Sequence, residues 1–257
     1  MNDNNPPPIP PAFNPSAGSP GLPNGPRALG DDPLDRVNIS GPLSAIEAIL
    51  RHPRRIIYQL RQPGAGSIVF ALLFIAVTCS VVYGVVVGTF SLGAQLWAAP
   101  VKIAAGLVTS AFICLPSLYI FSCLSGSQAR LAEVCGMIAG LLALMTVLLI
   151  GFAPVAWVFS QSTESLAAMG ALHLVFWFIA TYFGVRFLAT GFAHLSGKPG
   201  GLRVWVVIFL LVMAQMTTTL RPLVGTSDAF LQKEKKFFVK HWIEQIEKPS
   251  ATVPARQ

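Results

Sequence analysis

Charged side chains are scarce in this chain. Only 11% of its 257 residues are charged, whereas 53% are hydrophobic. A soluble domain carries about 25% charged residues, so the composition argues against a soluble globular protein. The charges that are present lie mostly between long apolar runs and near the C-terminus. This distribution is typical of a polytopic membrane protein.

Motifs for metal or covalent chemistry are also missing. The four cysteines form no CxxC pair, and none stands beside a histidine at metal-ligand spacing. The sequence contains no HExxH motif. We therefore expect a protein that is not an enzyme and that holds no metal or other cofactor. The cysteines are expected to be small, buried, reduced core residues. They are Cys79, Cys114, Cys123 and Cys135.

The net charge of +7 does not by itself indicate a nucleic-acid partner. Basic residues that flank membrane spans act as orientation signals and raise the net charge of many membrane proteins. The expected partner is the lipid bilayer, with no nucleic acid.

Five apolar segments each have close to the roughly 20 residues that a helix needs to cross the hydrocarbon core. They predict an all-α fold, a polytopic transmembrane bundle over residues 65–221 with amphipathic helices on both sides. The predicted spans are 67–89, 101–123, 132–158, 168–189 and 203–220. The last is the shortest, and a re-entrant segment is the alternative there.

The segments before the first span differ sharply in composition. Residues 1–38 are rich in proline, glycine and asparagine, which predicts a disordered tail. Residues 39–64 predict an amphipathic basic helix, broken or kinked at Pro53, that lies in the membrane interface. Its arginines are expected to reach the headgroups. They are Arg51, Arg54, Arg55 and Arg61.

The C-terminal residues 222–257 are rich in lysine and carry several aromatic side chains. They predict an amphipathic helix followed by a short tail, and a packing or interface role for that helix.

The loops predict the orientation of the chain. Basic residues precede the first span and also stand in the links between spans two and three and between spans four and five. By the positive-inside rule the N-terminus is cytoplasmic, in a multi-pass protein of the cell membrane. Five spans then place the C-terminus outside, whereas a re-entrant fifth segment would place it in the cytoplasm.

Small residues recur at every fourth position in several spans. Helices in lipid associate through close van der Waals contact, which small side chains permit. We therefore predict packing seams along these stripes, between helices whose backbones approach closely. The stripes are Ser80, Gly84 and Gly88; Ala132, Gly136 and Gly140; and Ala180 with Gly184.

Transport is the alternative function. The central parts of the spans hold no Asp, Glu, Lys or Arg, although ion pathways usually leave such residues there. A neutral or lipid path between spans could still use His173, Gln215 and Thr218. For His173 a structural, hydrogen-bonded role is the main interpretation. Lys102, at the mouth of the second span, is expected to snorkel to the headgroups.

The stretch "LPSLYIFSCLSGSQARLAEVCGMIAG", which begins at Leu115, and "IGFAP", which ends at Pro154, join two spans through a short Gly/Ser link. With the polar N-terminal region, the amphipathic lead-in and the five spans, this layout resembles the bacterial branch of the Yip1 family. The resemblance implies a five-span membrane protein, and eukaryotic members are trafficking scaffolds that bind small GTPases. It supplies no catalytic residue. We therefore expect a scaffold or accessory subunit with a protein partner or a second copy.

Overall fold

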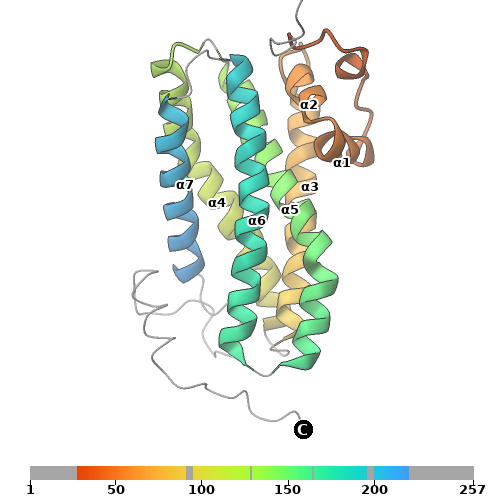
Figure 1. Ribbon diagram of the computed structural model, residues 1–257, viewed down its shortest axis with the longest axis vertical. Helices are drawn as coiled ribbons and strands as arrows, with labels where there is room; N and C mark the ends of the chain where they lie inside the picture. The colour runs from red at the N-terminus through yellow and green to blue at the C-terminus, as the bar shows by residue number, and fades with distance from the viewer. Residues whose placement is uncertain (1–27, 91–94, 128, 164, 196–199, 220–257) are drawn as a thin grey trace, which may run out of the picture.

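The computed structural model describes residues 28–90, 95–127, 129–163, 165–195 and 200–219 (Figure 1). All regular secondary structure in these ranges is helical, which confirms the predicted all-α class. The helices are η1 (Pro33–Arg36), α1 (Pro42–Arg51), α2 (Pro53–Leu60), α3 (Gly66–Thr89), α4 (Gln95–Leu124), α5 (Leu131–Ser162), α6 (Leu166–Leu195) and α7 (Gly200–Thr219). Residues 1–27 and the predicted C-terminal helix of 222–257 lie outside the described residues.

Four helices, α3 to α6, are long and apolar enough to cross a membrane. They coincide with the first four predicted spans, so the protein is a multi-pass membrane protein. The apolar part described for α7, Gly201–Thr217, is shorter than the other four. A full crossing by this fifth segment stays a prediction.

The order of the helices across the bundle differs from their order along the chain. Helix α3 lies between α4 and α5, α6 packs on the other side of α5, and α7 packs mainly on α4. Figure 1 shows the long helices side by side, with α1 and α2 against one end of the bundle. We call this the α2 end. Helices α3, α5 and α7 begin there, and α4 and α6 finish there (Figure 1).

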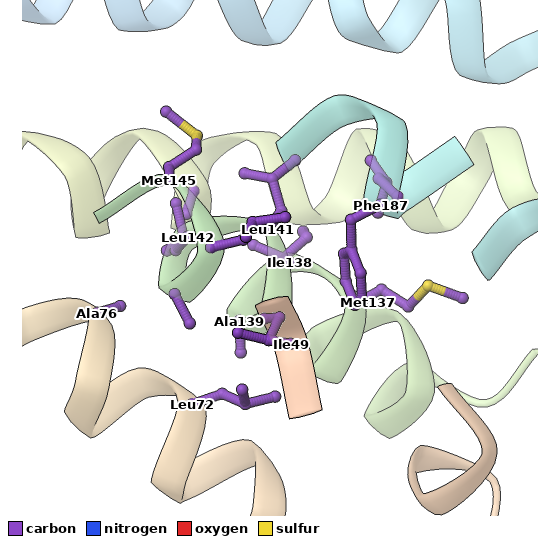
Figure 2. Packing of buried hydrophobic residues seen from close by; sticks show 14 of the residues in the cluster. Ile49, Leu72, Ala76, Met137, Ile138, Ala139, Leu141, Leu142, Met145 and Phe187 are labelled. Carbon is purple, nitrogen blue, oxygen red and sulfur yellow. The ribbon is translucent and has the colours of Figure 1, made fainter. Parts of the chain in front are cut away.

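The core lies around α5, the most buried of the four long helices. Helices α1, α2, α3 and α6 all contact it. Figure 2 shows the apolar side chains of α5 meeting those of its neighbours. Among them, Leu141, Leu142 and Met145 of α5 and Leu72 of α3 are almost fully buried.

Residues 28–40 fold against α2 rather than trailing away from the bundle. The short helix η1 is capped by the Asp32 carboxylate, which accepts a hydrogen bond from the Leu34 N–H at 2.9 Å. The predicted tail of 1–38 therefore extends too far, because residues 28–38 find hydrogen-bond partners on α2. The lead-in divides at His52, and α2 begins at Pro53, where the sequence predicted a break.

Candidate functional site

The closest approach of a helix backbone to a predicted small residue is between α3 and α4. Gly84 is buried, and a Cβ atom added there would meet the backbone Cα and N of Pro100. A backbone cannot rotate away as a side chain can. Only a residue without a side chain fits at this point of the seam.

Glycines on α5 and α6 receive large side chains instead. Gly140 of α5 faces the ring of Phe187 on α6, and Gly184 of α6 faces Met145 of α5. Gly136 of α5 receives Leu60 of α2. Gly136 and Gly140 accept bulky side chains, so the expectation of backbone-to-backbone approach does not describe these two positions. At Gly184 an added Cβ would also lie 3.2 Å from a backbone atom, the Leu141 oxygen.

The remaining stripe residues divide into buried and exposed. Ser80, Gly88 and Ala180 are buried. Ala132 is exposed at the start of α5, so the stripe predicted there begins one turn later, at Gly136. The Ser80 hydroxyl donates to the Val77 carbonyl oxygen of its own helix at 2.8 Å. The hydroxyl therefore needs no hydrogen-bond partner on the neighbouring helix.

Two of the four lead-in arginines hold the N-terminal segment in place. The Arg55 guanidinium donates to the Val37 and Asn38 carbonyl oxygens, both at 2.7 Å. Arg54 donates to the Ala28 oxygen at 3.0 Å and lies 3.5 Å from the buried carboxylate of Asp35. These contacts redirect both side chains from the expected headgroup role to binding the chain itself. Their spacing in the sequence gave no sign of this, because the partners lie 17 to 26 residues away.

The other two arginines are exposed. Arg61 follows α2. Arg51 is the last residue of α1 and forms an exposed salt bridge with Glu47, with 3.6 Å between the guanidinium nitrogen and the carboxylate oxygen. Surface pairs of this kind contribute about 0–1 kcal/mol. Both side chains stay available to headgroups.

The apolar side of α2 faces the protein, not the membrane. Ile56, Ile57 and Leu60 are buried in the core. The predicted interfacial stripe is therefore wrong for α2, because α5 and α6 cover that side of the helix. Helix α1 differs, since Ile49 is buried while Leu43 and Leu50 are exposed.

The polar-path residues predicted for the alternative function lie on two different helices. His173, on α6, forms a hydrogen bond between its Nδ1 and the Tyr83 hydroxyl of α3 at 2.7 Å, with the two rings edge to face. The His173 Nε2 is buried and has no hydrogen-bond partner among the described residues. Gln215 and Thr218 lie on α7, which packs mainly on α4. His173 is thus joined to α3 by its hydrogen bond with Tyr83. No pattern in the sequence pointed to Tyr83 as its partner.

Lys102 does not snorkel to the surface as predicted. Lys102 is 1% exposed and lies near the start of α4. Helix α4 begins at Gln95, several residues before the predicted span, so Lys102 lies within the helix and not at its mouth.

Helix α7 is anchored to α4 by one fully buried side chain. The Trp205 indole N–H donates to the Cys114 carbonyl oxygen at 2.9 Å, and the indole stacks on Phe209. Tryptophan is enriched at membrane interfaces, so the full burial of Trp205 needs a specific cause. The hydrogen bond accounts for its burial, since a buried indole N–H needs an acceptor.

All four cysteines are free thiols, and within the described ranges no three potential metal ligands come together. Cys114 is buried, and Cys79 and Cys135 are partly buried. Cys123 is exposed near the end of α4, so the expectation of a buried residue is wrong there.

Comparison of the chain with protein-family models, with curated proteins and with solved structures found no match in any of the three.

Proposed function

We propose that this protein is a non-enzymatic scaffold or accessory subunit of a bacterial inner-membrane complex. The observation that carries the proposal is the filled, apolar interior around α5. Leu, Met and Phe side chains occupy the spaces between helices, and glycines accept them where they would otherwise collide. Such an interior suits a rigid support more than a path for a solute.

Three buried hydroxyls support the same proposal. The hydroxyls of Ser110, Thr146 and Ser160 all donate to carbonyl oxygens of their own helices. A hydroxyl that is satisfied within its helix offers little to a passing ion or polar substrate.

We propose that the α2 end faces the cytoplasm. Arg61, Arg130 and Arg203 are exposed near this end, where α2 finishes and α5 and α7 begin. Positive charge beside short loops favours the cytoplasmic side. If α7 crosses fully, the C-terminus lies outside. A protease-protection assay on inverted vesicles, with epitope tags at both termini, tests this orientation.

The proposed contact surfaces are the N-terminal segment, the basic lead-in and residues 227–248. Affinity purification of the tagged full chain from native membranes tests the proposal. We expect one stoichiometric partner, or a second copy, that is lost when 227–248 are deleted and kept when only 249–257 are deleted. Purification of the full chain alone, as a monomer, would contradict it.

A neutral permease is the second candidate, and one observation favours it. The buried Nε2 of His173 is a polar atom without a hydrogen-bond partner in the part of the chain that the structure describes. Solute uptake into sealed vesicles tests this function. Flux lost in His173→Ala and kept in Val175→Ala, an exposed position on the same helix, would support a permease. Flux equal to that of empty vesicles would exclude it for the solutes used.

Membership of the Yip1 family is part of the same proposal. Its support is the order of elements, two short amphipathic helices followed by five apolar ones. It implies a scaffold or accessory subunit. It assigns no residue to a reaction.

A further inference from the structure

Helix α1 has three faces of different chemistry. Ala45, Ala48 and Ile49 form a face that is 0–2% exposed, packed on α3 and α5. Leu43 and Leu50 recur seven residues apart, on a second face, and are 83% and 47% exposed. Glu47 and Arg51 form a third, polar face. A helix that lies between a protein and water needs one apolar face and one polar face. Helix α1 has two apolar faces, so the exposed one requires an apolar neighbour other than the bundle.

The depth of α1 along the bundle follows from its contacts. Figure 2 shows Ile49 of α1 in the same buried cluster as Ala139 of α5 and Leu72 of α3, and α1 contacts both of these helices. Ala139 lies eight residues into α5, which is about 12 Å from the start of that helix. Helix α1 therefore lies alongside the long helices, below their ends.

Arg186 of α6 lies at the same level along the bundle. Phe187 of α6 fits against Gly140 of α5, so Arg186 is level with the α5 residues that α1 contacts. Arg186 is exposed, and Tyr182, one turn away, is 61% exposed. An exposed arginine on a membrane helix extends to the headgroups, and tyrosine prefers the interface.

The opposite boundary gives a consistent thickness. From Arg186 back to the start of α6 is about 20 residues, or about 30 Å, the thickness of a hydrocarbon core. On α5, Trp157 is exposed about 17 residues beyond Gly140, or about 25 Å away. Both helices thus place the boundary at the α2 end beside α1.

We propose that α1 is an in-plane lipid-binding helix, seated at the boundary between headgroups and acyl chains of the leaflet at the α2 end. Leu43 and Leu50 contact the acyl chains, Glu47 and Arg51 face the headgroups, and the alanine face holds the helix on the bundle. The occupant of the exposed apolar face is phospholipid. Helix α1 thereby widens the protein in one leaflet only. This inference depends on the membrane-spanning fold and not on the scaffold role.

Site-directed spin labelling tests the proposal on the full chain in vesicles of phosphatidylcholine and phosphatidylglycerol. Leu43→Cys and Glu47→Cys are each labelled in a chain whose four native cysteines are replaced by alanine. Both positions are exposed, so a label fits without disturbing the core. Collisions with oxygen, which concentrates in the bilayer, are compared with collisions with a water-soluble nickel complex.

We expect the ratio of oxygen to nickel collisions to be several-fold higher at position 43 than at position 47. A higher nickel accessibility at 43 would show that water covers this face and would overturn the proposal. Dipolar broadening between labels at 43 that persists on dilution with lipid would assign the face to a second copy, which also overturns it. Loss of the partner in the purification experiment above would leave this result unaffected.

Discussion

The seam between α3 and α4 and the seam between α5 and α6 both contain buried glycine, but the glycine has a different neighbour in each. At the first, Gly84 lies against the backbone of Pro100. At the second, Gly140 lies against the ring of Phe187, which has rotatable bonds. A regular spacing of small residues therefore indicates where helices meet. The neighbour decides how costly a larger residue is.

The rigid seam predicts the largest effect. In Gly84→Ala the added methyl group would collide with the Pro100 backbone, so α3 and α4 must separate. We expect a loss of about 1–3 kcal/mol in stability, as for other overpacked cores. Thermal unfolding in mild detergent, followed by circular dichroism, measures it.

Gly151→Ala is the matched control, because nothing lies within 4 Å of the position of its Cβ. It should melt at or slightly above the temperature of the unchanged protein, since alanine favours helix more than glycine does. Equal melting of the two variants would show that the α3–α4 seam tolerates a methyl group.

The seam with a side-chain neighbour predicts a smaller and rescuable effect. In Gly140→Ala the Phe187 ring must shift, and in Gly140→Ala/Phe187→Leu the added methyl group meets a shorter side chain. We expect the double variant to be more stable than the sum of the two single changes, with a coupling energy of about 0.5–3 kcal/mol. The four proteins of the cycle are compared by the same melting experiment. Additive changes would mean that the two residues do not interact.

The sequence was sufficient to predict the parts of the fold that depend on local pattern. Long apolar runs predicted α3 to α6, and the four-residue spacing identified Gly84, Gly140 and Gly184 as buried positions. It could not show that α3 packs between α4 and α5, because hydropathy specifies the medium around a helix and not its neighbours.

The errors at the lead-in have a related cause. An apolar stripe on a basic helix fits a membrane surface and a protein surface equally well. On α2 the stripe faces the protein, and Ile56 and Ile57 are buried. Arg54 and Arg55 bind backbone oxygens of residues 28–38, a contact that depends on how the chain folds back. Tyr83 was missed for the same reason, because its partner His173 is 90 residues away.

A third seam, between α4 and α7, is held by a hydrogen bond and predicts the smallest effect. Trp205→Phe keeps an aromatic ring in the core but removes the N–H that donates to the Cys114 oxygen. We expect a loss of about 1 kcal/mol, the net value of a typical hydrogen bond, measured as a lower melting temperature. Trp157→Phe is the control, because Trp157 is exposed and this variant should melt at the unchanged temperature.

Since α7 packs mainly on α4, the loss of the Trp205 hydrogen bond should also speed amide hydrogen exchange in α7 before it affects α5. Equal acceleration in both helices would show that α7 unfolds only together with the bundle, and that its seam is as firm as the two that contain buried glycine.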